Sequence, residues 1–168
     1  MELRHTAGDE ALLLDLLNST PIVDGVQRDL LSREWLRTRA GTGSSAEIAA
    51  TRRARDVLQD VVRGDAAIDA LGPLFDGISY RPAIVGDGLD WALEVSPPRR
   101  LATRAALTWD TLRRTSPGRL RPCENTECAL FLIDHSKPNK ARWCSMAVCG
   151  NRMKARRHYE RTHTNRES

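Results

Sequence analysis

Cysteine is missing from the first 122 residues of this 168-residue chain, and all four cysteines lie in the remainder. A disulfide framework spread over the whole fold is therefore excluded. No apolar run approaches the roughly 20 residues that a membrane helix needs, and Met1–Gly8 lacks the basic-then-apolar pattern of a signal peptide. We therefore expect a cytoplasmic protein without membrane contact.

Recognisable catalytic machinery is also missing. Gly41–Ser45 is rich in glycine and serine, but no Gly-Lys-Ser/Thr follows it and no strand precedes it, so it is not a phosphate-binding loop. We expect a flexible connection there. No nucleophile–base set, open metal site or cofactor loop is visible, which predicts a protein that is not an enzyme.

Lysine is scarce, and the three lysines all lie after residue 136. Residues 1–120 hold 16 Lys and Arg against 17 Asp and Glu, a net charge of −1, whereas residues 121–168 hold 10 against 5, a net charge of +5. A compact basic segment is the electrostatic footprint of nucleic-acid binding, although a solvated basic tail has the same composition.

Apolar periodicity predicts a mainly α fold. The helical patterns begin at Asp9, at Ser32, at Ser45 (ending at Gly64), at Asp65 and at Pro97. Residues 78–95 alternate around Gly86-Asp87-Gly88, which predicts one β-hairpin. Because Ser116-Pro117-Gly118 ends the last helix, we expect a helical domain over 1–115, a linker over 116–120 and a C-terminal module over 121–168.

The sequence predicts the surroundings of two groups of side chains in the N-terminal part. Arg52, Arg53 and Arg55 are predicted to form a solvated helix face. Trp35, Trp91 and Trp109 are candidates to line a pocket for a small molecule.

The four cysteines form two matched pairs, Cys123/Cys128 and Cys144/Cys149, each spaced Cys-x4-Cys, with fifteen residues between the pairs. Four thiolates satisfy the tetrahedral preference of Zn²⁺ and leave no open position, so we expect one structural zinc ion. Disulfides are the alternative. A site with three cysteines and one histidine is also conceivable, but His135, His158 and His163 are not needed to complete the tetrahedron.

Around the cysteines we expect a treble-clef-like fold or a ribbon followed by a helix. Phe131–Ile133 predicts a short strand, and a basic helix is expected from about Asn151 to His163. The backbone amides of the polar turn Glu124–Glu127 are expected to donate to the thiolates. Phe131 and Trp143 are predicted to pack around the metal rather than to stack on bases.

The predicted nucleic-acid contacts come from the basic residues of this module. Lys154, Arg157 and Arg161 lie at i, i+3 and i+7, which places them in one stripe along a helix. Arg152 has two interpretations, a phosphate contact or a brace on Asp134. The whole candidate set comprises Lys137, Lys140, Arg142, Arg152, Lys154, Arg156, Arg157 and Arg161.

Several spaced elements together resemble the CGNR zinc finger. They are Cys123-x4-Cys128, Phe131, Asp134, Ser136, Arg142-Trp143-Cys144-Ser145-Met146 and Cys149-Gly150-Asn151-Arg152-x-Lys154. Upstream, Asp15–Thr20, Asp29-Leu30-Leu31 and Trp35-Leu36 are similar to the helical ABATE domain that usually precedes this finger. The loop Lys137–Ala141 is less rich in arginine than that family pattern.

The resemblance implies a bacterial, stress-induced transcriptional regulator whose finger binds DNA, which would make the protein nucleoid-associated. In this hypothesis the N-terminal domain senses a ligand or forms a homodimer. One alternative is a zinc-stabilised module that binds a protein of the transcription machinery, and another is a small-molecule-binding protein. Because folding and metal binding are linked, we expect Cys144→Ser to unfold the module and to spare residues 1–115.

Overall fold

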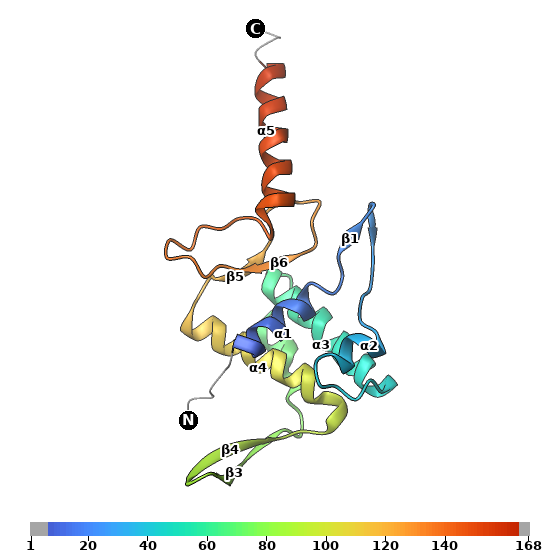
Figure 1. Ribbon diagram of the computed structural model, residues 1–168, viewed down its shortest axis with the longest axis vertical. Coiled ribbons are helices and arrows are strands. Elements are labelled where there is room, and N and C mark those ends of the chain that lie inside the picture. Colours follow the sequence, from blue (N-terminus) through green and yellow to red (C-terminus); the bar gives the residue numbers. More distant parts are fainter. Residues whose placement is uncertain (1–6, 165–168) are drawn as a thin grey trace.

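Three long helices build the body of the protein in the computed structural model, which describes residues 7–164 (Figure 1). They are α1 (Ala7–Leu17), α3 (Ser45–Arg63) and α4 (Arg100–Thr115). The shorter elements of the body are helix α2 (Arg33–Arg37) and the 3₁₀ turns η1 (Ile68–Leu74) and η2 (Pro97–Arg99). The predicted mainly α fold is confirmed. None of the helices in the described range combines the length and apolarity required to cross a membrane.

The helix ends follow local chemistry. The hydroxyl of Ser32 accepts a hydrogen bond from the N–H of Trp35, and that of Ser44 accepts one from Glu47. Gly64 closes α3 with φ of +86°, a conformation that costs glycine little. The helix that was expected to begin at Asp9 begins earlier, at Ala7. Asp9 lies inside α1 and pairs with Arg104 of α4 at 2.5 Å.

Leucines of α1 pack between α3 and α4 and form the main core. Its buried members are Leu13, Leu16, Leu17, Leu31, Leu58, Leu71, Ala105, Ala106, Trp109, Leu112 and Phe131. The last of these belongs to the cysteine-containing part of the chain, which therefore packs directly on the body.

Expectations about two surface segments need correction. Arg52 and Arg53 are exposed, as predicted, but Arg55 is not on the solvated face. It is only 5% exposed and donates to Asp29, which also pairs with Arg52. The segment from Gly41 to Ser45 is ordered, since the buried carboxylate of Glu47 accepts hydrogen bonds from Gly43 N–H and from Thr42, both at 2.8 Å.

We expect Asp29→Ala to lower the free energy of unfolding by about 2 kcal/mol, because it removes one of the two carboxylates that accept from the buried guanidinium of Arg55, the other being that of Asp56. Partial burial opposes ionisation of Asp29, but the hydrogen bonds from Arg55 and from the Leu31 N–H, together with the charges of Arg55 and Arg52, outweigh it and lower the pKa of the carboxyl group. The stabilisation of the folded state by ionised Asp29 is therefore fully present above about pH 4, near the pKa of an unfolded aspartate. It is lost as the pH falls below that value and through the lowered pKa of the folded state. Urea unfolding at neutral pH measures the difference. The exposed Asp60→Ala is the control and should change stability by less than about 0.5 kcal/mol.

The strands within residues 7–164 form three antiparallel pairs. The predicted hairpin is confirmed as β3 (Ser79–Val85) with β4 (Gly88–Glu94), joined by Gly86-Asp87. In the C-terminal part, β5 (Leu120–Pro122) pairs with β6 (Phe131–Ile133), the strand expected there. A third pair, β1 (Ile22–Val23) with β2 (Val26–Gln27), was not predicted. Its turn is Asp24-Gly25, both at positive φ, and this dipeptide is a recognised hairpin signal.

The ribbon β5–β6 is anchored to the body around Phe131. This side chain is 1% exposed in the main core, and the guanidinium of Arg63 lies 4.6 Å from the centre of its ring. Asn18 binds the Phe131 backbone in both directions, accepting from its N–H at 2.7 Å and donating to its carbonyl at 3.2 Å. Phe131 thus packs as predicted, but against the helical body and not around the metal cluster. Residues 116–119 form a turn, closed by the hydrogen bond from Arg119 N–H to the Ser116 carbonyl, and Leu120 already belongs to β5, so the two parts share one core.

Candidate metal centre and basic helix

The sulfur atoms of Cys123, Cys128, Cys144 and Cys149 all lie within 4.8 Å of one another. The Cys128–Cys144 and Cys144–Cys149 distances are both 3.7 Å. A tetrahedron with Zn–S bonds of about 2.3 Å has S–S edges of about 3.8 Å, whereas a disulfide is only about 2.05 Å long. The four thiols therefore fit a closed, four-coordinate metal site.

Two short segments bring the thiols together. Cys123 directly follows β5, and Cys128 follows the polar turn after it. Cys149 lies in η3 (Met146–Gly150), a single turn of π-helix, which runs into α5 (Asn151–Thr164). The backbone N–H of Glu124 donates to the carbonyl of Arg142 at 2.9 Å and so ties the two segments together. The predicted ribbon followed by a helix is the observed arrangement.

Asn125 is a buried hydrogen-bond partner of the cluster that was not among the predicted site residues. It is 1% exposed, its side-chain amide donates to Cys149 Sγ at 3.5 Å, and its oxygen accepts from Glu127 N–H. Cys144 N–H also donates to Cys123 Sγ at 3.5 Å. In the described residues the donors to sulfur are thus the Asn125 side chain and the backbone N–H groups of Cys144 and Leu130, which lie outside the turn Glu124–Glu127 that was expected to supply them.

Burial raises the pKa of the Cys128 thiol to about 11, and burial with hydrogen bonding among the thiols raises the pKa of Cys144 as well. Burial also opposes ionisation of Cys149, but hydrogen bonds from Asn125 and the neighbouring thiols outweigh it and lower its pKa. Thiolates so close together repel one another, so a bound cation is the physical means of holding them all ionised.

Histidines are not part of this cluster among the described residues. His135 is exposed and lies 3.3 Å from Glu10, and His158 is exposed on α5. The side chain of His163 is outside the described residues. The four-cysteine prediction therefore needs no histidine ligand.

Helix α5 stands away from the rest of the molecule and packs mainly on η3 (Figure 1). Lys154, Arg157 and Arg161 line one hollow together with Glu160, as their spacing predicts. Within residues 7–164, no carboxylate forms an ion pair with any of these three cations. We call Lys154, Arg157 and Arg161 the basic stripe.

The other arginines of the candidate set are paired with acids. Arg142 forms a salt bridge with Glu124. Glu127 lies 3.9 Å from Arg152 and 3.8 Å from Arg156, and Arg156 also approaches Glu160 at 3.3 Å. The proposed brace of Arg152 on Asp134 is wrong, because Arg121 occupies that place.

Asp134 organises the loop that carries Lys137 and Lys140. Its carboxylate accepts from Arg121 at 2.9 Å and from the N–H groups of Ser136 and Ala141. Hydrogen bonds from Ser136 and Ala141, with the charge of Arg121, lower the pKa of Asp134 to about 2. Both lysines are exposed on this loop, on a different segment from the basic stripe.

Trp143 connects the metal centre to α5. Its ring lies 5.1 Å from the guanidinium of Arg142 and 5.9 Å from that of Arg157. A side chain at Gly150 would approach Trp143 to 3.2 Å and Met146 to 2.8 Å. Trp143 therefore packs over η3 beside the metal centre, and a side chain at position 150 would force the end of Met146 to shift.

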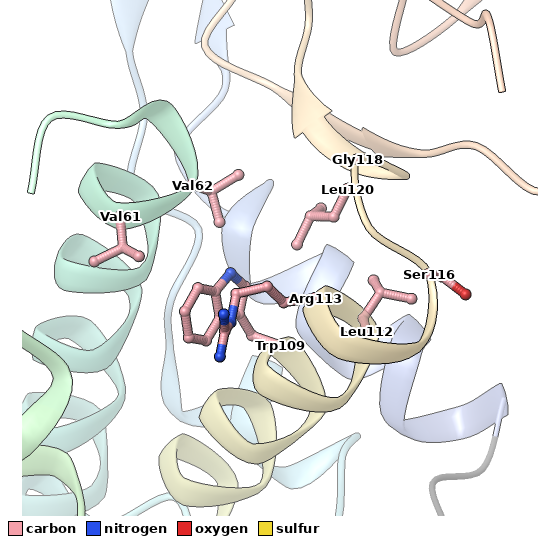
Figure 2. A pocket seen from close by; sticks show the side chains of 8 residues that line it. All are labelled: Val61, Val62, Trp109, Leu112, Arg113, Ser116, Gly118 and Leu120. Carbon is pink, nitrogen blue, oxygen red and sulfur yellow. The ribbon is translucent and has the colours of Figure 1, made fainter. Parts of the chain in front are cut away.

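The three tryptophans proposed to share a pocket lie apart. Trp35 stacks with Arg39, and Trp91 is on the hairpin β3–β4. Trp109 lines a pocket of about 180 Å³ between α3, α4 and β5. Figure 2 shows Val61 and Val62 of α3 facing Trp109, with Leu120 of β5 beside them. A second pocket, of about 400 Å³, lies near Trp109 between α4 and η1. Neither pocket includes Trp35 or Trp91.

The site defines a small module with a four-cysteine structural metal centre, packed on a helical body. Residues 119–162 match the family model of the CGNR zinc finger, which confirms the resemblance for this part of the chain. No curated protein matches the chain. The ABATE-like assignment of the N-terminal part stays a prediction.

Proposed function

We propose that this protein is a zinc-dependent nucleic-acid-binding regulator, without enzymatic activity, that docks the basic stripe on the phosphate backbone of double-stranded DNA. The observation that carries the proposal is a contrast among the basic residues of the cysteine-containing module. Lys154, Arg157 and Arg161 have no carboxylate partner in the described part of the chain, whereas Arg142, Arg152 and Arg156 have one. Unpaired cations on one face can each replace a counterion on a phosphate.

Zinc is the metal that best suits the centre. Four cysteine sulfurs within 4.8 Å of one another, with two of the distances at 3.7 Å, suit its preferred tetrahedral shell of about 3.8 Å edges, and they leave no position for substrate or water. The ion would hold the two cysteine segments together and fix the start of α5. In this proposal its role is structural, and the helical body senses a ligand or dimerises. The stress-related role implied by the family resemblance belongs to the same hypothesis.

Gel-shift titration of the zinc-loaded full chain against a duplex of random sequence tests the proposal. If the three cations of the stripe contact phosphates, affinity should fall at least about 40-fold between about 50 and 200 mM salt. A matched single strand and an RNA duplex show which nucleic acid is preferred. Absence of salt-dependent binding to any of the three would refute the proposal.

A second candidate is a protein-interaction module, and it rests on apolar groups beside the metal. Met146 and Val148 of η3 are 54% and 56% exposed, and Val148 shares a hollow of about 160 Å³ with Ile22 of β1 and three of the cysteines. Such a surface suits an apolar side chain of a partner in the transcription machinery. Co-purification of one stoichiometric protein after nuclease treatment, lost in Val148→Asp, would favour this candidate.

A further inference from the structure

The hairpin β3–β4 projects from the body at the end opposite to α5 (Figure 1). Neither strand makes an extensive contact with another described helix or strand, and none of its residues belongs to the buried core. A two-stranded ribbon alone in water is at best marginally stable. We therefore expect another surface to cover this hairpin of seven paired positions and to stabilise it.

One face of this hairpin is entirely apolar. Side chains alternate between the two faces of a strand, and residues paired across the ribbon share a face. The register pairs Tyr80 with Leu93, Pro82 with Trp91 and Ile84 with Leu89 on one face. Ile84 and Leu89 are each 75% exposed, and Trp91 is 49% exposed. We call these six residues the apolar face.

The opposite face carries the charges. Arg81 and Glu94 form a salt bridge at 2.5 Å, and Asp90 lies on the same side. This segregation makes the hairpin amphipathic, although Pro82, Ile84, Leu89 and Trp91 on its apolar side are exposed and only Tyr80 and Leu93 are half-buried. Contiguous exposed apolar patches of this kind mark interaction sites in soluble proteins.

The edge of β3 is unsuited to pairing with another strand. Pro82 lies in the middle of the strand and has no N–H to donate, and proline in a ribbon occupies positions whose missing N–H would point outward. A partner is therefore expected to cover the face of the ribbon and not to extend its β3 edge.

We propose that the apolar face binds the same face of a second copy of this chain, with the two hairpins antiparallel about a two-fold axis. The distribution of charge along the hairpin favours this partner. Asp87 in the turn makes the tip acidic, whereas the segments that flank the strands at the base, residues 76–78 and 95–100, hold two arginines against one acid. The antiparallel arrangement brings the acidic tip of each copy to the basic base of the other. The apolar face carries no charged side chain, so two such faces in contact do not repel each other.

This inference rests on the dimerising role proposed for the N-terminal part, and it does not depend on nucleic-acid contact. Because the hairpin and α5 lie at opposite ends of the molecule, such a dimer leaves both basic stripes accessible. The molecular mass of the protein in solution, measured without nucleic acid, therefore tests dimerisation separately from DNA binding.

Sedimentation velocity of the zinc-loaded full chain over a wide concentration range is the test. The wild-type protein should reach twice its monomer mass of 18.8 kDa. Ile84→Lys combined with Leu89→Lys should remain at the monomer mass. The milder Leu89→Ser should raise the dimer dissociation constant on the order of 100-fold, since each dimer loses two buried leucines.

Val85→Lys is the matched control, because Val85 is 61% exposed in the same hairpin but lies outside the apolar face. It should dimerise like the wild type, and all variants should keep the same helical circular dichroism and metal content. A wild-type monomer at every concentration overturns the proposal, whether or not another protein binds the hairpin. Equal dissociation of Val85→Lys and the double variant also overturns it.

Discussion

Cys144→Ser should abolish zinc binding and lower the thermal stability of the whole chain, including the helical body. Structural zinc contributes about 10–16 kcal/mol to the folding of small modules, which exceeds the net stability of many domains. Loss of the metal would release the ribbon β5–β6 and with it Phe131, whose removal from a core costs about 3–5 kcal/mol. The structure therefore revises our expectation from the sequence that residues 1–115 would be spared.

Metal analysis and thermal unfolding followed by helical circular dichroism measure the two effects. The wild type should carry about one zinc ion per chain, as four thiolates complete one tetrahedron. Val148→Ser is the matched control, because it changes an exposed residue of η3 that is not a ligand and should leave both quantities unchanged. A Cys144→Ser protein with the wild-type melting temperature would show that the two parts fold independently.

Neutralising the basic stripe should produce the second large effect, a loss of duplex affinity on the order of 100-fold at low salt. Replacing Lys154, Arg157 and Arg161 together by glutamine removes three phosphate contacts, and the slope of log affinity against log salt should become shallower by about 2.7. The loss should be similar for unrelated duplex sequences, because phosphate contacts carry no sequence information.

The control for charge is a second triple variant, Arg28→Gln, Arg33→Gln and Arg53→Gln, which removes three exposed cations from the body. Net charge changes equally in the two variants, so any difference between them measures position. If both lose affinity to the same extent, binding depends on total charge and the basic stripe has no special role. Arg152→Gln with Arg156→Gln should have a smaller effect than the stripe, because Glu127 already offsets these charges.

Local chemistry explains which parts of the fold could be predicted from the sequence. The ends of α3 follow from Ser44 and Gly64, and the hairpin β3–β4 follows from strict alternation around a glycine-rich turn. The four-cysteine cluster follows from two equal spacings, since each short loop brings its own pair together. In each case the determining groups lie within a few residues of one another.

The parts that could not be predicted depend on contacts between distant segments. Three apolar residues at Phe131–Ile133 indicate a strand, but not the surface on which it packs. Arg55 meets Asp29 across 26 residues, and the partner of Asp134 is Arg121 because the ribbon register brings them together. The tryptophans were grouped by residue type alone, and the fold separates them.

The pocket in Figure 2 has one wall from each part of the chain. Val61 and Trp109 belong to the helical body, whereas Leu120 begins the strand that ends one residue before Cys123. A molecule filling this pocket would contact both parts at once, so its affinity would depend on the metallation of the module. By the reciprocity of linked equilibria, it would change the affinity of the cysteines for the metal by the same factor. Effector and metal would then act as each other's allosteric ligands.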